Sequence, residues 1–195
     1  MFNELAIMMI MMWPAVPMFL IELHLSISFW RRLGLWTYLV IIAEWLPIGI
    51  TLLLLQGIFL SRDFTLGLPF LILGIVMIVM ALVLHGWTAK LICLKATIGY
   101  SELKPNTEAQ NHALVTTGPF SIVRHPSYWA HAAIMLGIFF VTGVVATGII
   151  ALIDLAINYF VTTTLEDHEL VDRFGDQYRQ YQKSVPKFFP KVTKR

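Results

Sequence analysis

The chain has 195 residues, of which 57% are hydrophobic and 13% are charged, and its mean hydropathy is +0.73. Soluble domains carry charge on about a quarter of their residues, so this composition excludes an ordinary soluble fold and predicts one membrane domain. The formal net charge of +2 gives no indication of a nucleic-acid partner, and a single cysteine, Cys93, excludes an internal disulfide and a cysteine-rich metal site.

Three apolar stretches occupy the N-terminal half of the chain, at residues 5–30, 35–60 and 64–94. Each exceeds the roughly 20 residues that a membrane-spanning helix needs. The chain start has no basic segment and no small-residue cleavage site follows it, so we interpret the first stretch as a retained helix and not as a cleavable signal peptide. We therefore predict three transmembrane helices within residues 1–94.

The C-terminal half, residues 95–195, is predicted to be a cofactor-binding segment with a helical hairpin. A polar segment, 95–127, precedes apolar stretches at 128–141 and 144–165, which Thr142-Gly143 joins. The stretch at 128–141 is shorter than an ordinary membrane span, so we read the pair as a tight hairpin. The fold class is thus all-α and integral to the membrane, with about five transmembrane helices.

The polar tail after residue 165 is predicted to hold a short cytosolic helix. Its apolar side chains recur every three or four residues, which places them on one helical face. Pro186 and Pro190 then end the helix. The stripe consists of Phe174, Tyr178, Tyr181 and Val185.

The basic residues predict the orientation of the chain in the membrane. If the N-terminus lies outside, thirteen of the fourteen lysine and arginine residues fall on the cytosolic side, and Arg62 is the exception. An excess of basic residues in cytosolic loops is the usual bias of membrane proteins. The C-terminus and the polar segment are therefore predicted to be cytosolic.

The start of the fourth predicted helix combines a basic flank with free backbone donors. Pro126 suits the first helical position and favours an extended backbone at His125, next to Arg124. A helix N-terminus with cationic neighbours can bind an anion. Lipid headgroups at a basic helix start are the alternative interpretation.

Acidic residues follow the second helix of the predicted hairpin, and they are expected at the membrane face where the first helix of the hairpin begins. Because its two helices are antiparallel, Glu166 and Asp167 are expected near Arg124 and His125. Such a site suits a ligand that carries both signs of charge. A structural salt bridge between Arg124 and Glu166, or a solvated helix end, would explain the same pattern.

These motifs together resemble the isoprenylcysteine carboxyl methyltransferase family. The string Leu114-Val115-Thr116-Thr117-Gly118-Pro119-Phe120 is followed by Arg124-His125-Pro126-Ser127-Tyr128 and then by Glu166-Asp167. Leu170, Phe174-Gly175, Tyr178, Tyr181 and Val185-Pro186 also fit that family's C-terminal pattern. The resemblance covers residues 110–190 and does not extend to the first three helices.

The resemblance implies an S-adenosylmethionine-dependent methyltransferase without a Rossmann domain, and the sequence indeed lacks a Gly-x-Gly-x-x-Gly motif between a strand and a helix. Arg124, His125 and Glu166 are the predicted catalytic residues. By position in the family's motif, the residues predicted to bind the cofactor are His112, Ala113, Leu114, Val115, Phe120, His125, Pro126, Ser127, Tyr128 and Glu166.

These residue types suit the groups of the cofactor. A helix N-terminus with a histidine or arginine can hold its carboxylate, and Glu166 can accept hydrogen bonds from its ribose or ammonium group. The ring of Tyr128 can pack near its sulfonium.

The methyl acceptor is expected to be lipophilic and to enter from the bilayer, with the carboxylate of a prenylated-cysteine-like molecule first among the candidates. The chain departs from the family at Thr162, which stands where the eukaryotic enzymes have a substrate-binding arginine, and at Asp167, which replaces a glutamate. A phospholipid amine, a thiol or another small lipophile is therefore kept as an alternative. A membrane sterol reductase that uses NADPH, with a similar Arg-His-Pro-x-Tyr motif, is the alternative from another class, and the sequence leaves the oligomeric state open.

Ionisable residues inside the apolar stretches are costly in lipid and are candidates for function. Asp154 is expected to be structural, and interhelical hydrogen bonding is the alternative to function for the others. The candidates for lining a substrate tunnel are Glu22, His24, Glu44, His85 and His131.

Overall fold

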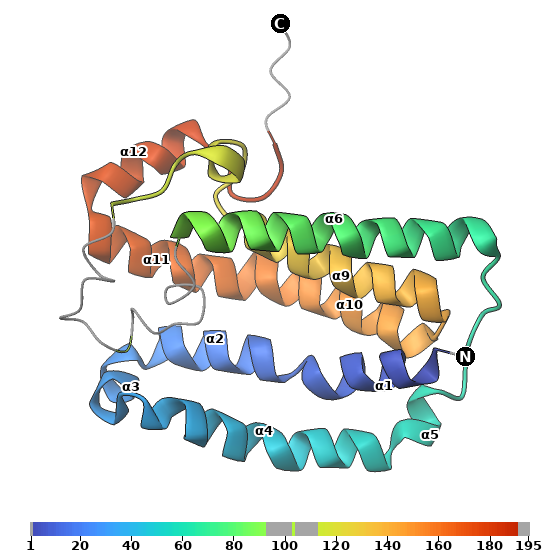
Figure 1. Ribbon diagram of the computed structural model, residues 1–195. Helices are drawn as coiled ribbons and strands as arrows, with labels where there is room; N and C mark the ends of the chain where they lie inside the picture. Colours follow the sequence, from blue (N-terminus) through green and yellow to red (C-terminus); the bar gives the residue numbers. More distant parts are fainter. Residues whose placement is uncertain (1, 93–102, 104–112, 191–195) are drawn as a thin grey trace, which may run out of the picture.

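The computed structural model describes residues 2–92, 103 and 113–190, and the regular structure in these ranges is helical (Figure 1). The long helices run side by side, so the expected all-α fold is confirmed. The elements are α1 (Asn3–Met12), α2 (Ala15–Leu25), α3 (Ile27–Leu33), α4 (Trp36–Leu54), α5 (Gln56–Phe59), α6 (Leu68–Ile92), η2 (Gly118–Ser121), α9 (Pro126–Thr142), α10 (Val145–Ile157), η3 (Asn158–Thr162), α11 (Thr163–Phe174) and α12 (Asp176–Ser184).

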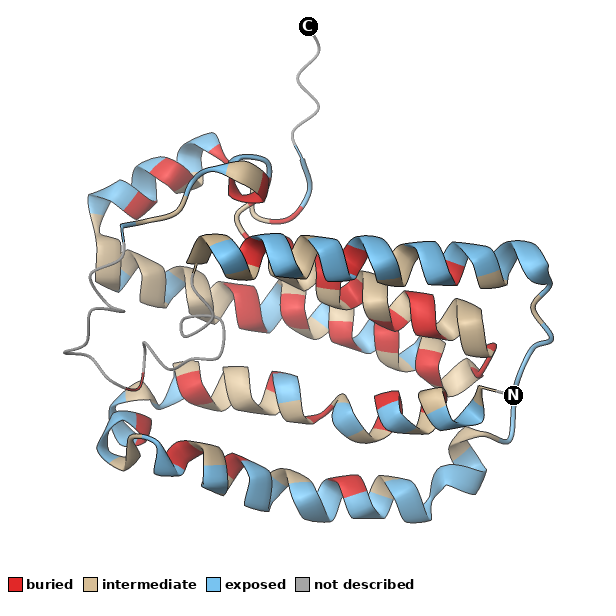
Figure 2. Ribbon diagram, viewed as in Figure 1, coloured by how far each residue is buried: buried red, intermediate tan, exposed pale blue. Residues whose placement is uncertain are grey.

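Four helical stretches are long and apolar enough to cross a membrane. They are Asn3–Leu25, Trp36–Leu54, Leu68–Ile92 and Val145–Phe174, and the 17-residue α9 is a shorter apolar helix beside them. Large apolar side chains remain exposed along α4 and α6, where Figure 2 shows mostly pale blue surface. An extended apolar exterior of this kind is expected where lipid covers the protein.

The closest helix contact is the crossing of α6 and α9, at Gly74 and Gly137. A Cβ atom added at Gly74 would lie 2.6 Å from the carbonyl oxygen of Gly137, and one added at Gly137 would lie 2.9 Å from the oxygen of Gly74. Small residues at such a crossing let two membrane helices pack backbone to backbone. The contact fixes α9, and with it the residues at its N-terminus, against α6.

The predicted hairpin of the fourth and fifth apolar stretches is present, and its turn is pinned to the loop before α6. Gly143 ends α9 with φ of +70°, a conformation that favours glycine. Its carbonyl oxygen accepts a hydrogen bond from the Phe64 amide at 2.9 Å, and Val145 donates to the oxygen of Arg62 at 3.1 Å. These bonds hold the turn and the loop at one end of the bundle (Figure 1).

The last membrane helix is longer than predicted, and the predicted short C-terminal helix is present as α12 but begins later, at Asp176. The helix continues through η3, a π-helical turn, into α11 and ends at Gly175, where φ is +56°. The hydroxyls of Thr163 and Thr164 donate to backbone oxygens one turn back, each at 3.0 Å. The helix continues past its apolar part because several of its polar residues, such as Glu166, face a cavity inside the protein.

The apolar stripe predicted for the tail is real but is shared by two helices. Phe174 closes α11, whereas Tyr178 and Tyr181 belong to α12, which the turn at Gly175 redirects. Tyr178, Tyr181 and Val185 nevertheless form one buried cluster, against which Leu114, Leu170, Val171 and Phe174 pack. The cluster joins α12 to α11 and to the segment before α9.

Candidate functional site

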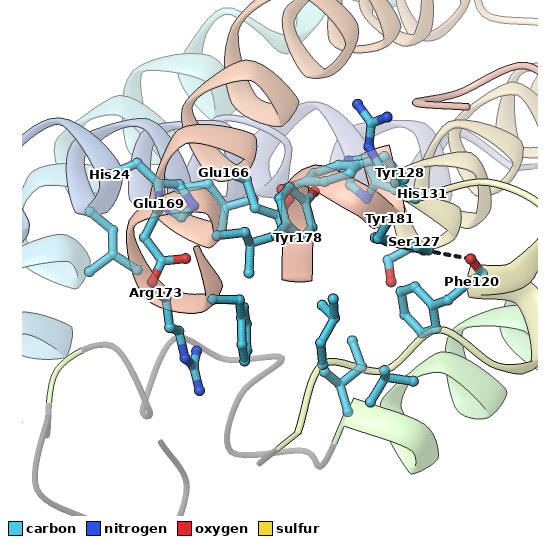
Figure 3. A pocket seen from close by; sticks show the side chains of 18 of the residues that line it. His24, Phe120, Ser127, Tyr128, His131, Glu166, Glu169, Arg173, Tyr178 and Tyr181 are labelled. Carbon is cyan, nitrogen blue, oxygen red and sulfur yellow. Dashed lines mark hydrogen bonds between the residues drawn. The ribbon is translucent and has the colours of Figure 1, made fainter. Parts of the chain in front are cut away.

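A cavity of about 280 Å³ lies among α2, α6, α9, α11, α12 and the segment before η2. Its apolar wall comes mainly from α2, the end of α6 and residues 114 and 115. Carboxylate, guanidinium and hydroxyl groups converge from the other elements, and imidazole groups come from α2, α6 and α9 (Figure 3). The lining consists of Val16, Leu20, Leu23, His24, His85, Ile92, Ala113, Leu114, Val115, Phe120, Arg124, Ser127, Tyr128, His131, Glu166, Glu169, Leu170, Arg173, Phe174, Tyr178 and Tyr181.

The N-terminus of α9 forms one side of the cavity. Pro126 occupies the first helical position, and the residue before it, His125, has φ of −121° outside the helical region, as the sequence predicted. The first turn of the helix carries Ser127 and Tyr128, and both line the cavity. The backbone before Pro126 is held by the C-terminal tail, because Arg124 donates its amide to the oxygen of Pro186 at 2.9 Å.

Asp167 holds the two cationic residues of this motif together. One carboxylate oxygen accepts from Arg124 Nη2 at 2.8 Å, and the other lies 2.9 Å from His125 Nε2 and accepts from the Tyr178 hydroxyl. Arg124 also donates through Nη1 to the backbone oxygens of Gln182 and Val185, at 3.2 and 3.0 Å. Asp167 is therefore fully engaged in linking α9, α11 and α12.

Glu166, the neighbouring carboxylate, is in a different position. Its Oε2 atom lies 3.2 Å from His125 Nδ1 but is buried and has no hydrogen-bond partner of normal geometry among the described residues. The side chain lines the cavity (Figure 3). Of the two adjacent carboxylates, Asp167 thus holds the structure together and Glu166 is open to a ligand.

The His125 ring lies between these carboxylates, with only 2% of its side chain exposed. Burial acts to lower its pKa, but the Glu166 and Asp167 carboxylates outweigh burial and raise the pKa above the usual value for histidine. The imidazolium form is favoured because it donates toward a carboxylate from each ring nitrogen.

The residues after α12 close the outer side of the site. Trp129 Nε1 donates to the backbone oxygen of Phe188 at 2.6 Å, and the buried Phe188 ring packs against the indole with centroids 5.1 Å apart. Tyr181 donates its hydroxyl to the backbone oxygen of Phe120 (Figure 3), and its pKa is raised to about 12 because the ring is buried. These two hydrogen bonds join the start of α9 and the segment before it to α12 and the residues that follow α12.

Most of the residues predicted to bind the cofactor lie at the cavity. His125 and Pro126 are buried behind its wall, and His112 lies outside the described residues. Those that line the cavity are Ala113, Leu114, Val115, Phe120, Ser127, Tyr128 and Glu166, together with the predicted catalytic residue Arg124.

The five candidates for a substrate tunnel divide into two groups. His24, His85 and His131 line the cavity, from α2, α6 and α9 respectively. Glu22 and Glu44 do not line it, and Glu44 is exposed on α4. The cavity therefore draws on both parts of the chain, 1–94 and 95–195.

Sequence reasoning missed several residues of the lining because it ended the last membrane helix too early. Glu169 and Arg173 follow Glu166 at helical spacing on the same face of α11, and Leu170 and Phe174 accompany them. Extending the helical pattern beyond residue 165 would have found these residues. The positions of Tyr178 and Tyr181 required the turn at Gly175 to be known.

Among the described residues, no group of three or more histidine, cysteine, aspartate or glutamate side chains is placed to hold a metal ion. The carboxylates of the site are turned instead toward His125, Arg124 and the cavity.

The phospholipid methyltransferase family matches residues 69–177, which is more than half of the chain. The match begins in α6, includes the hairpin of α9 and α10, and ends just inside α12. It therefore covers both motifs that converge on the cavity. No solved structure matches the chain.

Three curated proteins illustrate the range of similarity. A protein-S-isoprenylcysteine O-methyltransferase of Schizosaccharomyces pombe is 31% identical over 99 residues, which cover 51% of this chain and 42% of that protein. The cobalt-zinc-cadmium resistance protein CzcN of Cupriavidus metallidurans is 31% identical over 84 residues, which cover 43% of this chain and 38% of that protein. The nickel-cobalt-cadmium resistance protein NccN of Alcaligenes xylosoxydans xylosoxydans is 26% identical over 163 residues, which cover 84% of this chain and 66% of that protein.

The chain thus spans between 38% and 66% of the length of these relatives.

Proposed function

We propose that this chain, which belongs to the phospholipid methyltransferase family, is an integral membrane enzyme that transfers a methyl group from S-adenosylmethionine to a lipophilic acceptor. The observation that carries the proposal is the Glu166 carboxylate, which lines the cavity and whose buried Oε2 atom has the ion pair with His125 at 3.2 Å but no hydrogen bond of normal geometry among the described residues. A buried carboxylate oxygen is costly unless its hydrogen bonds are complete, so a ligand that supplies a further donor would bind there favourably.

The cavity suits this cofactor in the charge and the mixed polarity of its walls. Its volume of about 280 Å³ is close to the roughly 300 Å³ at which ligand pockets begin, and apolar and polar walls lie side by side. We assign Glu166 to the ribose or ammonium group and the start of α9, with Ser127, to the carboxylate. Tyr128 supplies a ring near the sulfonium.

When bound, S-adenosylmethionine supplies an electrophilic methyl group. The part of the protein is to hold the reactants in line and to exclude water. Asp167 does this indirectly, because it fixes Arg124 and His125 and leaves the neighbouring Glu166 at the cavity. The apolar residues of α2 and α6 in the lining admit the alkyl part of an acceptor.

The class of the acceptor is part of the proposal. A relative named for isoprenylcysteine supports a prenylated-cysteine-like carboxylate, which is already ionised at neutral pH and needs no base. The position that holds a substrate-binding arginine in the eukaryotic enzymes is Thr162 here, and it is fully buried in η3. A phospholipid amine, a thiol or another small lipophile therefore stands beside the carboxylate as a candidate.

The test is calorimetric titration of the detergent-purified protein with S-adenosylmethionine and, separately, with NADPH. We expect saturable binding of S-adenosylmethionine only. Glu166→Gln should weaken that binding by roughly tenfold to a hundredfold, because charge-assisted hydrogen bonds contribute about 1.5–3 kcal/mol.

Asp172→Asn is the matched control for this test. Asp172 is an exposed carboxylate on the same helix as Glu166 and does not line the cavity, so its replacement should leave binding unchanged. Binding of NADPH without binding of S-adenosylmethionine would refute the proposal and favour a reductase. Equal losses of S-adenosylmethionine affinity in the two variants would refute the role of Glu166.

A further inference from the structure

A second polar group lies deeper among the helices, around Asp154, and the proposed function does not use it. Asp154 is 0% exposed and accepts hydrogen bonds from Trp13 Nε1 at 2.8 Å and from Asn158 Nδ2 at 2.7 Å. His131 Nε2 lies 3.3 Å from Asp154 Oδ2. The group thus joins α1, α9, α10 and η3.

His131 connects this buried group with the cavity. Its Nε2 atom is buried and has no hydrogen bond of normal geometry among the described residues, yet 22% of the side chain is exposed. The exposed part therefore belongs to other atoms of the side chain, and the residue lines the cavity together with Tyr128 (Figure 3). His131 thus lies next to a fixed carboxylate and also contributes to the wall of the ligand space.

The surroundings of His131 fit a neutral acceptor better than an anionic one. Of the two guanidinium groups in the lining, Arg124 binds Asp167 and two backbone oxygens, and Arg173 lies over the Phe174 ring at 5.0 Å, beyond Glu169 on α11. The titratable side chains around the ring are His85 from α6, Asp154 from α10, and Tyr128 on α9 itself, with Glu166 across the cavity. A carboxylate placed beside His131 would face the Asp154 carboxylate, and Glu166 lines the same cavity.

We propose that His131, backed by Asp154, accepts a proton from the methyl acceptor, and that the acceptor is a lipophile with a dissociable proton on its nucleophilic atom, such as a thiol or an amine. This inference rests on the proposed function. For a thiol, the S–H bond breaks, its proton goes to the imidazole, and the electron pair left on sulfur forms the bond to the transferred methyl group. A neutral amine attacks with its own lone pair, and its N–H bond breaks as the new N–C bond forms, so that the proton again goes to the imidazole. The imidazolium that results is stabilised by the Asp154 carboxylate at 3.3 Å.

The first experiment needs no methyl donor. The full-length protein in detergent is mixed with para-octylthiophenol, an aryl thiol whose thiolate absorbs at longer wavelength than the neutral thiol, and a difference spectrum is recorded as pH varies. We expect the wild-type protein to ionise the bound thiol at lower pH than detergent alone does. His131→Gln should reduce the ionised fraction at neutral pH at least tenfold while the probe still binds, and Asp154→Asn should reduce it less.

The matched control is His168→Gln. His168 is an exposed histidine on α11 outside the cavity lining, so its replacement should leave the spectrum at the wild-type value. If His131→Gln fails to fold, the wild-type and Asp154→Asn spectra still decide the question. The inference would be overturned if the bound thiol stays un-ionised on the wild-type protein, or if the protein does not bind the thiol.

The second experiment compares methyl transfer to dodecanethiol and to N-acetyl-S-farnesylcysteine. With the thiol, the rate should fall as the pH is lowered, because a proton acceptor works only in its neutral form. If His131 instead binds a carboxylate as imidazolium, the rate should rise toward low pH, farnesylcysteine should be preferred and the inference fails. Thiolate formation without any methyl transfer would refute the proposed function and leave the proton acceptor in place.

Discussion

Two adjacent acidic residues have different tasks at the site, and the difference comes from which atoms meet each carboxylate. Asp167 receives Arg124, His125 and Tyr178, so both of its oxygens are engaged. Glu166 has one buried oxygen without a hydrogen bond and faces the cavity. Replacing the first should therefore affect stability, and replacing the second should affect binding.

Asp167→Asn tests the first of these statements. The substitution leaves the Arg124 guanidinium, with 9% of its side chain exposed, and the His125 ring without their carboxylate partner. Removing one partner of a buried ion pair costs about 3–5 kcal/mol. The unfolding temperature in detergent should fall sharply. Asp176→Asn is the control, because Asp176 pairs with Arg179 on an exposed face, where the loss should stay below about 1 kcal/mol.

The raised pKa of His125 predicts how the stability of the protein depends on pH. Its pKa is raised in the folded protein, because the Glu166 and Asp167 carboxylates outweigh the effect of burial. The folded state therefore binds the proton more tightly than the unfolded chain does. The stabilisation is complete below the pKa of the unfolded histidine, about 6.5, and is lost as pH rises through the raised pKa.

The measurement is the unfolding temperature of the wild type and of His125→Gln between about pH 5.5 and pH 9, on either side of the ordinary histidine pKa. The difference between the two proteins should be largest at the acidic end and shrink as pH increases. A difference that grows with pH would show that His125 is stabilising in its neutral form.

At the scale of the elements, the contact of α6 with α9 is the one that places the N-terminus of α9. Gly74→Ala should disrupt this contact, because the new Cβ would lie 2.6 Å from the Gly137 oxygen and 2.9 Å from Val141 Cγ2. Overpacking of a tight interface costs roughly 1–3 kcal/mol. Unfolding in detergent is expected to occur at lower temperature, and S-adenosylmethionine binding should weaken together with stability.

Gly86 on the same helix provides the control. A Cβ atom there would have nothing within 4 Å, so Gly86→Ala should be neutral or slightly stabilising. Similar effects of the two substitutions would mean that glycine matters in α6 for helix propensity and not for the contact with α9.

The elements were predictable where one physical signal dominated. The apolar stretches and the Thr142-Gly143 turn gave the helices and the hairpin, because lipid requires long apolar segments and a short connection requires a permissive residue. The end of the last helix was missed. Polar residues after 165 resembled a solvated tail, and sequence alone does not reveal that they face an internal cavity.

At the scale of the whole molecule, the sequence predicts that the two motifs lie close together, but it does not predict the cavity between them. The antiparallel hairpin requires Arg124 and His125 to lie near the acidic pair, as the structure shows. The motif alone did not reveal that Asp167, and not Glu166, pairs with Arg124. The contributions of Val16, Leu20 and other α2 residues depend on how distant helices pack, and no short-range pattern encodes that.

The orientation of the molecule in the membrane is the remaining prediction. Figure 1 places the loop before α6 and the α9–α10 turn at one end of the bundle, and α3, α11 and α12 at the other. Among the described residues, the first end has Arg62, whereas the second has the basic residues of α3, α11 and α12. Since basic residues favour the cytosolic side, the end with the cavity should be cytosolic.

Labelling of single cysteines tests this orientation. In a Cys93→Ser background, a cysteine is introduced at one of three exposed positions: Leu35, before α4, Thr65, before α6, or Gln180, in α12. With a membrane-impermeant maleimide on intact cells, Thr65→Cys should react at once, and Leu35→Cys and Gln180→Cys only after permeabilisation. The reverse pattern would place the cavity outside. Labelling of Thr65→Cys and Gln180→Cys from the same side would contradict the three crossings between them, and with them the assignment of α9 as a spanning helix.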